Sequence, residues 1–493
     1  MISDSKLFFR DKYNQYGVDN GLKYVFLACL VLGWSLSAAA NCPDIDKDEI
    51  VRFIEGVDAC ATVMSTVDQE DQLNDYFAVN ILREGLRPRS AEDIQSAFEQ
   101  EQPGFAQSSF VVAEGGQIPT SIADRDKPRN PRYVITWTDH PEDSSSTVLL
   151  STNGGEPETF IQVIAWDGEK KAFNFYEILS TTDGGGADVT NGSWTWAGDS
   201  SFATNPEASG KGCFDCHHNG VVIMKELETP WNNWHSQTAT ISSSLMPSDV
   251  AGQSFFIDKK GGEILESIIS SGFRNYQGEW LRSRLVNVDG GGFQVNDVDL
   301  MLRHVVTNTT VNFISSQIQS NGSNTSPPNS DISSIPNDLF VNEKVLRTLL
   351  GLNYTIPNIQ LPRSDYDNYL DQFNYRLIQT QSPSYEAPGS TYFSFFIPKP
   401  AEEDFAFIQR LIQAGIVDDK FVGAVSLVDV ENPVFSNIRS SLLIYSNQIS
   451  TGAISSEGVS TIPDEFADLV SEVASSQQPI CDEAAVKLQP DSR

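Results

Sequence analysis

Residues 160–178 read FIQVIAWDGEKKAFNFYEI, and this stretch decides the fold class of the first half of the chain. Phe160–Trp166 and Ala172–Ile178 follow a hydrophobic period of two, which is typical of β-strands. Asp167 and Gly168 between them accept the positive φ angles of a tight turn. The stretch therefore predicts a β-hairpin.

The same period continues on both sides of the hairpin, at Tyr133–Trp137, Val148–Leu150 and Trp194–Trp196. Residues 130–200 are therefore expected to form an antiparallel sheet. The apolar residues of 46–57 and 68–86 recur at helical spacing instead. This spacing predicts helices within residues 41–105.

The second half of the chain returns to the helical period. Helices are predicted at 263–273, 297–306 and 338–352, and a Ser-, Asn- and Pro-rich segment at 315–337 is expected to be a solvated loop. The expected fold class is α+β, with N-terminal helices and an antiparallel sheet followed by a mainly α-helical C-terminal half. We expect one domain at 41–250 and a helical companion at 251–493.

Composition and charge restrict the possible partners. The chain has 493 residues, of which 40% are hydrophobic, enough to bury at least one large core. Its 33 Lys and Arg against 66 Asp and Glu give a formal charge of -33. Such a chain would repel nucleic acid and an anionic bilayer. A protein partner with a basic docking face is expected instead, and the oligomeric state is not predicted.

The N-terminal segment has the pattern of a signal peptide. Four basic residues precede an apolar run of thirteen residues at 24–36, and Ser-Ala-Ala-Ala follows at 37–40. We expect cleavage before Asn41 and a periplasmic or secreted protein. A helix of this length spans about 20 Å, which is less than the roughly 30 Å of a bilayer core, so no permanent membrane span is expected. An uncleaved N-terminal anchor is the alternative.

Residues 213–217 read CFDCH, and this C-x-x-C-H pattern is that of c-type haem attachment. Two thiols three positions apart can each add to one vinyl group of haem, and the adjacent imidazole then falls under the iron. With six cysteines and five histidines in the chain, roughly 0.0007 occurrences are expected by chance. A zinc ribbon would need a second C-x-x-C, and a thioredoxin-like dithiol would need a strand-to-helix context.

The chain therefore resembles the c-type cytochromes, and a monohaem member because C-x-x-C-H occurs once. Strands before the motif and an extended Val221–Met224 after it are similar to the β-sheet cytochromes of the c-prime-beta and P-460 group, although the large C-terminal half differs. The resemblance implies one covalently attached haem c, with Cys213 and Cys216 as thioether anchors and His217 as the proximal iron ligand. It also implies electron transfer.

The sixth ligand of the iron decides between function classes. His235 and Met246 are the candidate distal ligands, and either would favour electron transfer. An open position would instead permit a haem-dependent oxidoreductase acting on peroxide, O2 or a nitrogen oxide, or a gas-binding haem protein. No catalytic residue is assigned.

The cysteines outside the motif and the signal peptide are Cys42, Cys60 and Cys481. A bridge between Cys42 and Cys60 and a link from Cys481 to the N-terminal region are both compatible with export. The sequence does not choose between them.

Overall fold

The computed structural model describes residues 44–101, 104–113, 131–139, 148–153, 160–179, 192–217, 246–307, 402–429 and 436–474, with shorter pieces at 42, 220–222, 227, 234–237, 240–243, 351 and 432. The strands at 311–315, 332–335, 359–362 and 396–400 are described as backbone only. The chain divides into two compact units, Met1–Asp44 and Ile45–Arg493, and the following concerns the second. The signal peptide expected at 1–40 and the helix expected at 338–352 lie outside the described residues.

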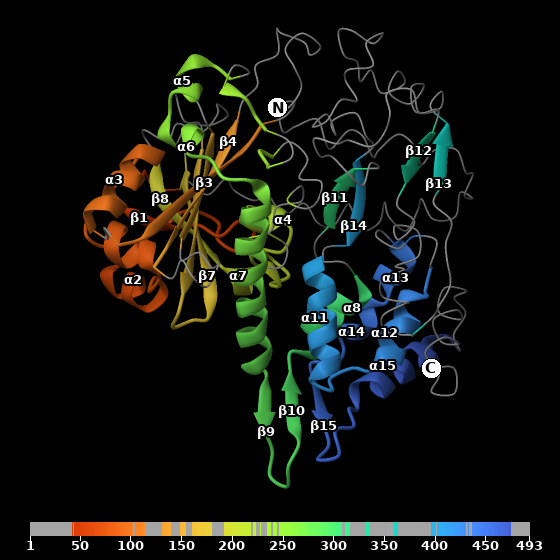
Figure 1. The fold of residues 1–493 in the computed structure, drawn as a ribbon. Coiled ribbons are helices and arrows are strands. Elements are labelled where there is room, and N and C mark those ends of the chain that lie inside the picture. The colour runs from red at the N-terminus through yellow and green to blue at the C-terminus, as the bar shows by residue number, and fades with distance from the viewer. Residues whose placement is uncertain are drawn as a thin grey trace, which may run out of the picture. The chain divides into compact units, whose positions relative to one another are not determined.

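An eight-stranded sheet forms the N-terminal part of this unit (Figure 1). Its strands are β1 (Ile50–Arg52), β2 (Thr62–Val63), β3 (Ala106–Val112), β4 (Arg132–Thr138), β5 (Val148–Asn153), β6 (Ile161–Asp167), β7 (Ala172–Leu179) and β8 (Ser193–Asp199). Their order is β2-β1-β8-β7-β6-β5-β4-β3. The sheet predicted for 130–200 is confirmed, but it is mixed rather than purely antiparallel, because β1 lies parallel to β8.

Strands β6 and β7 form the predicted hairpin, with a longer connection than expected. Asp167 pairs with Ala172, so residues 168–171 make the turn. Lys171 has the positive φ of this turn, at 56°. The Asp167 carboxylate accepts the backbone N–H of Lys170 at 3.0 Å, which closes the connection.

The helix expected over 46–57 is wrong, because residues 50–52 form strand β1. This strand pairs in parallel with Trp194–Trp196 of β8. Ile50 and Val51 are neighbours in sequence and both are 1% exposed. An amphipathic helix buries a single stripe, whereas a strand covered on both faces buries consecutive residues. The pairing with β8 is a distant contact that local spacing does not reveal.

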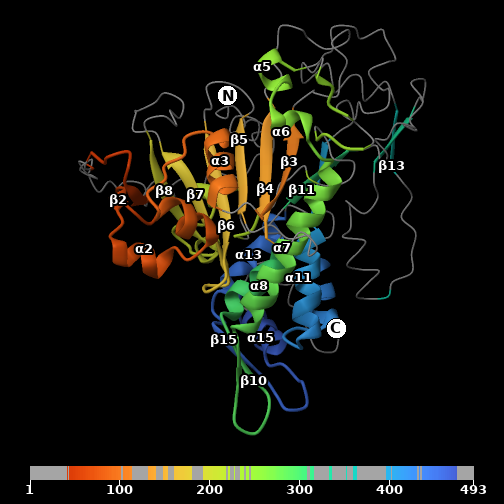
Figure 2. The same ribbon diagram turned by 60° about the vertical axis from the view of Figure 1, so that its left-hand side comes forward.

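The helix predicted over 68–86 is present in two pieces, α2 (Thr66–Gln72) and the π-helix η1 (Ala78–Leu82), and α3 (Ala91–Glu101) follows. A capping box starts α2: Ser65 Oγ accepts the Asp68 N–H, and the Asp68 carboxylate accepts the Ser65 N–H, both at 3.2 Å. Figures 1 and 2 place α2 on one side of the sheet and α7 (Gly262–Arg282) on the other.

Aromatic side chains join the N-terminal helices to the sheet. Phe98 of α3 stacks on Trp137 of β4 with ring centroids 4.5 Å apart, and Phe77 meets the edge of Trp194 at 5.1 Å. Trp196 lies on the same face of β8 as Trp194. Both tryptophans of β8 therefore point towards the helices.

A buried carboxylate interrupts this apolar layer. Asp75 is 1% exposed and accepts hydrogen bonds from the Tyr176 hydroxyl, from Asn174 Nδ2 at 2.8 Å and from the Ala78 N–H at 3.0 Å. Burial raises the pKa of Asp75 to about 6, although these donors act to lower it. Tyr176 of β7 thus directs its hydroxyl to the helix-covered face.

The opposite face of the sheet packs against α7. Tyr276 of this helix lies 6.3 Å from Phe173 of β7, measured between ring centroids. The short helices η3 (Ser200–Ala203), α4 (Cys213–Cys216), α5 (Ser248–Ala251) and α6 (Ser254–Ile257) precede α7 in the chain. The first hydrophobic core extends to Tyr276, and a second core begins at Leu281 in the same helix.

The second core is formed mainly by helices. They are α8 (Val298–Val306), α11 (Glu402–Gln413), α12 (Asp419–Ser426), α13 (Asn437–Ser441), α14 (Leu443–Ser446) and α15 (Ile462–Ala474). A three-stranded sheet of β9 (Leu285–Asn287), β10 (Phe293–Asn296) and β15 (Thr451–Ile454) accompanies them. The helices predicted at 263–273 and 297–306 are confirmed, and the fold class is α+β.

Two further strand pairs lie between α8 and α11 in sequence. They are β11 (Val311–Ser315) with β14 (Phe396–Pro400), and β12 (Ile332–Ile335) with β13 (Ile359–Pro362). Strand β12 falls inside the segment 315–337, which was expected to be a loop. The polar composition of this segment gave no strand pattern, and β12 forms because it pairs with the distant β13. Among the helices of the described residues, none has the length and hydropathy to cross a bilayer.

Candidate cofactor site

The C-x-x-C-H motif forms a single helical turn. Helix α4 begins after Gly212, whose φ of 52° lies in the region that favours glycine. It ends at His217, whose N–H bonds to the Cys213 carbonyl at 3.0 Å. Cys213 and Cys216, three positions apart on one turn, lie on the same side of the helix.

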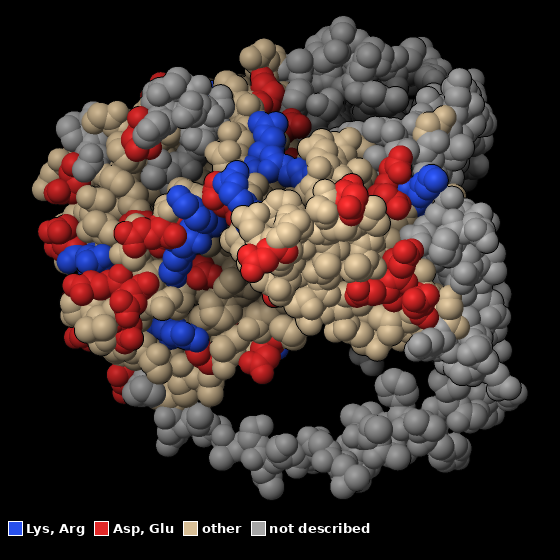
Figure 3. Space-filling model, turned by 90° about the horizontal axis from the view of Figure 1, so that it is seen from below, with Lys and Arg blue, Asp and Glu red and all other residues tan. Residues whose placement is uncertain are grey.

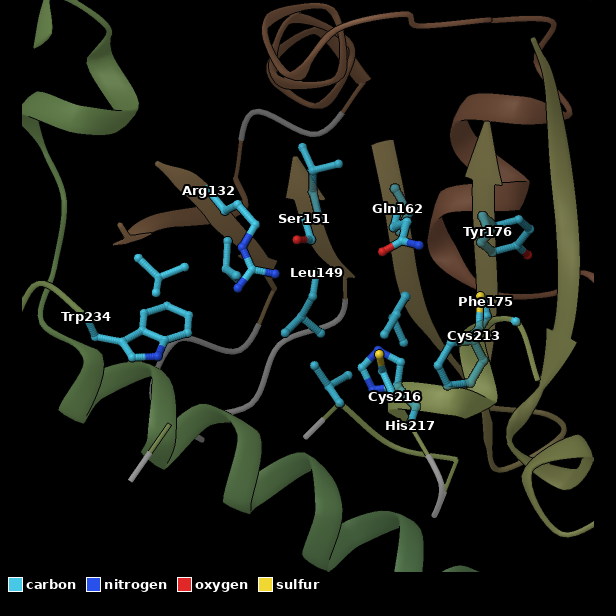
Figure 4. A pocket seen from close by; sticks show the side chains of 17 residues that line it. Arg132, Leu149, Ser151, Gln162, Phe175, Tyr176, Cys213, Cys216, His217 and Trp234 are labelled. Atoms are coloured by element: carbon cyan, nitrogen blue, oxygen red, sulfur yellow. The ribbon is translucent and has the colours of Figure 1, made fainter. Parts of the chain in front are cut away.

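The three motif side chains line one cavity of about 320 Å³ (Figure 4). Ligand pockets commonly measure roughly 300–1,000 Å³. Most of the remaining lining is apolar and comes from the sheet and the segments after the motif: Val112, Val134, Leu149, Leu150, Val163, Ile164, Phe175, Val222 and Trp234. The polar residues that the sheet adds are Arg132, Ser151, Gln162 and Tyr176, of which Tyr176 directs its hydroxyl to Asp75 on the other face.

Strand register places one subset of the lining residues on a single face of the sheet: Val134, Leu149, Ser151, Gln162, Ile164 and Phe175. Leu150 and Val163 are their immediate neighbours in sequence and belong to the opposite face. Leu149 pairs with Ile164, and Ile164 pairs with Phe175, which gives an apolar row across β5, β6 and β7. The adjacent row contains Ser151 opposite Gln162. The face of β4, β5, β6 and β7 that lines the cavity is called its floor below. Because strands lie roughly 4.8 Å apart, this floor is about 14 Å wide. It faces away from α2 and α3.

His217 has a defined orientation at one end of this floor. Its Nδ1 lies 2.9 Å from the Val221 carbonyl oxygen, and its ring is 5.5 Å from that of Phe175. A carbonyl can only accept, so Nδ1 carries the proton and the lone pair of a neutral imidazole is on Nε2. The same arrangement orients metal-binding histidines, in which the second ring nitrogen donates to a carbonyl or carboxylate. The side chain is therefore suited to bind iron.

Residues 220–222, which supply the Val221 carbonyl, are held to β7 by hydrogen bonds through Ser200. Ser200 Oγ donates to the Gly220 carbonyl at 2.6 Å and accepts the Phe173 N–H at 2.8 Å. Gly220 has φ +72°, and a Cβ there would lie 2.5 Å from the Ser200 carbonyl oxygen. Only glycine fits this approach, which sets the position of the hydrogen-bond acceptor of His217.

Both motif cysteines are free thiols, whereas Cys42 and Cys60 are disulfide-bonded. Burial, followed by the nearby Glu177 carboxylate, raises the pKa of the Cys213 thiol well above its usual range. Dithiols of the thioredoxin type have a lowered pKa instead. The Cys213 thiol therefore differs from the reactive thiol of a thioredoxin-like dithiol.

The two candidate distal ligands do not line the cavity. Val112 at the end of β3 forms an isolated antiparallel β-bridge with Trp234, and the Trp234 side chain lines the cavity in place of His235. His235, the next residue, has an Nδ1 that accepts the Ile241 N–H at 3.1 Å. Burial, with a contribution from Lys259, lowers its pKa to about 4. Met246 is 9% exposed and belongs to the first hydrophobic core, outside the lining.

Four lining residues were not identified from the sequence: Arg132, Ser151, Gln162 and Trp234. Nothing in their local sequence marks them, because each follows an ordinary strand or loop pattern. Strand parity would have placed the first three on one face, had the register between β4, β5 and β6 been known.

Two residues named in the sequence analysis, Met224 at the end of the expected extended segment and Cys481, lie outside the described residues. Within the described ranges, no group of three or more His, Cys, Asp or Glu side chains could hold a metal ion by itself.

Comparison of the chain with protein-family models, curated proteins and solved structures finds no match.

Proposed function

We propose that the protein is an exported monohaem c-type cytochrome. Cys213 and Cys216 would form thioether bonds with the two vinyl groups of one haem, and His217 would bind its iron through Nε2. The observation that carries this proposal is that all three side chains line a single, mostly apolar cavity wide enough to extend across four strands. An accidental CxxCH sequence would have no reason to border such a cavity.

The residues of the chain have separate tasks in this proposal. The two thiols fix the position of the cofactor, and the Val221 carbonyl fixes the ring of His217. The apolar row of Leu149, Ile164 and Phe175 excludes water, which influences the reduction potential. When bound, haem supplies a metal that gains and loses single electrons.

Charge supports a basic redox partner. The chain carries a formal charge of -33, and complementary charge mainly accelerates association. Asp and Glu side chains are spread over the face shown in Figure 3 rather than gathered in one patch. We therefore attribute the attraction to net charge, and expect the association rate to fall as salt increases. A rate independent of salt would contradict this part of the proposal.

The experiment is expression of the full chain in a host that matures c-type cytochromes. The purified protein should have the mass of the polypeptide plus one haem, resistant to acidic acetone, together with a Soret band. Cys213→Ser with Cys216→Ser should abolish attachment. His217→Ala should change the axial ligation, whereas His235→Ala, the matched control, should leave the spectrum unaltered. A polypeptide without added mass would refute the proposal.

An iron site open to exogenous ligands is the second candidate, either as a haem-dependent oxidoreductase or as a gas-binding protein. The observation that favours it is the position of Trp234, which lines the cavity where His235 was expected. Indole does not ligate iron as imidazole does. The ferrous protein should then bind carbon monoxide rapidly. A low-spin spectrum unchanged by carbon monoxide would instead favour simple electron transfer.

A further inference from the structure

We propose that Arg132 binds the carboxylates of the cofactor, at the end of the cavity opposite the thiols. The inference rests on the proposed function, because the carboxylates are the two propionates of a haem held by Cys213 and Cys216. Arg132 is the one permanently charged side chain among the described residues that line the cavity. No feature of the C-x-x-C-H motif assigns it this role.

Arg132 lies at the end of the cavity farthest from the motif (Figure 4). Arg132 belongs to β4, and the ring of His217 lies beside that of Phe175 in β7. Strands β5 and β6 lie between β4 and β7, so three strand spacings, about 14 Å, separate the two ends of the cavity. Figure 4 shows Arg132 at one side of the row of lining side chains and Cys213, Cys216 and His217 at the other. The vinyl and propionate groups of haem lie on opposite edges of the porphyrin. Anchoring the vinyl edge at the thiols therefore directs the propionates away from α4.

The two ends of the cavity differ in charge. Glu177 follows Phe175 by two positions in β7 and therefore lies on the cavity face of the sheet. Glu55 Oε2 lies 3.3 Å from the position that a Cβ on Gly212 would take. Carboxylates therefore border the motif end of the cavity. Two additional carboxylates there would be repelled. The guanidinium of Arg132 is at the other end, and a planar guanidinium pairs with carboxylate through two parallel hydrogen bonds.

The sheet surface that lines the cavity also differs in polarity from one row of residues to the next. The row of Leu149, Ile164 and Phe175 suits an apolar ring, whereas Ser151 and Gln162 in the adjacent row offer hydrogen bonds. The porphyrin ring is apolar except at its propionate edge, and the sheet surface that lines the cavity is likewise apolar except at Arg132 and in the row of Ser151 and Gln162. Ser151 and Gln162 would therefore assist Arg132 in holding that edge.

The test is the reduction potential of the haem-loaded protein and its Arg132→Gln variant. Loss of the positive charge should favour the ferric form on the order of tenfold, which lowers a one-electron potential by about 59 mV. Arg132→Lys keeps the charge and should restore most of the potential. Arg282→Gln, an exposed control with a partner in Glu279, should leave it unchanged. Circular dichroism would verify that each variant is folded.

The outcomes separate the two proposals. Failure of the wild type to carry haem refutes the proposed function. Haem attached, with the potential of Arg132→Gln equal to that of wild type, overturns the role of Arg132 alone. The cavity end could instead receive a free anion, which a titration with sodium formate would reveal. A formate-induced spectral change that Arg132→Gln abolishes, without the shift in potential, would also overturn the assignment to propionate.

Discussion

Asp75 makes the stability of the fold depend on pH in an unusual direction. Its pKa is raised from 3.8 to about 6 in the folded chain, chiefly by burial. The folded state therefore binds the proton more tightly than the unfolded state does. Protonated Asp75 stabilises the fold fully below pH 3.8, and this contribution is lost as the pH rises through about 6. At about 1.4 kcal/mol for each pKa unit, the loss is about 3 kcal/mol.

Asp75→Asn tests this reasoning because it removes the titration and keeps the size of the side chain. We expect the free energy of unfolding of wild type, relative to the variant, to fall by about 3 kcal/mol between about pH 4 and about pH 8. Urea denaturation at intervals across this range measures the difference. Asp71→Asn changes an exposed carboxyl in neighbouring α2 and is the matched control, for which a flat difference is expected.

The sign of the difference decides the outcome. If wild type gains stability relative to Asp75→Asn as the pH rises, the three hydrogen bonds to the carboxylate outweigh its desolvation. The stated cause of the raised pKa would then be wrong.

Three further substitutions test the packing of the sheet and the support of the motif. Phe98→Ala removes the ring that stacks on Trp137 and should lower the free energy of unfolding by about 3–5 kcal/mol, a loss that urea denaturation would detect; a loss within error would contradict the contact. Ser200→Ala removes one donor and one acceptor from buried hydrogen bonds and should cost about 1–3 kcal/mol, with an altered Soret spectrum in the haem-loaded protein. Gly220→Ala should lower the melting temperature more than Ser200→Ala does, since its Cβ would clash with backbone; equal melting temperatures for wild type and Gly220→Ala would refute the close approach.

The sequence predicted the central strands because their environment is local and regular. Tyr133–Trp137 and the hairpin of β6 and β7 are short runs rich in β-branched and aromatic residues, which specifies strands, although both faces of the sheet are covered and consecutive residues are buried. The helices beginning near residues 262 and 298 were also predictable, since each has an apolar stripe at helical spacing. Helix α2 has no buried residue, and its start is marked instead by the capping box of Ser65 and Asp68. The α+β fold class follows from these elements.

What the sequence could not predict depends on pairing between distant segments. Ile50 and Val51 have apolar side chains compatible with a helix, and only the presence of β8 makes them a strand. Likewise, Trp234 and His235 are equally plausible occupants of the cavity until the bridge to Val112 fixes which one points inward. The motif was visible because its chemistry requires a fixed spacing, whereas Arg132 carries no such mark.

The parallel pairing of β1 with β8 has a consequence for how the chain reaches its native state. A ribosome or a translocation channel delivers Ile50 long before Trp194, so the first strand must wait, without its neighbour, until the last strand of the sheet has emerged. Closing such a long loop is entropically costly and slows folding. Cys213 follows shortly after β8 in the chain. Completion of the sheet and delivery of the C-x-x-C-H motif are therefore nearly simultaneous. Under the proposed function, an attachment enzyme would have only a short interval in which the thiols are accessible beside a newly formed hydrophobic surface.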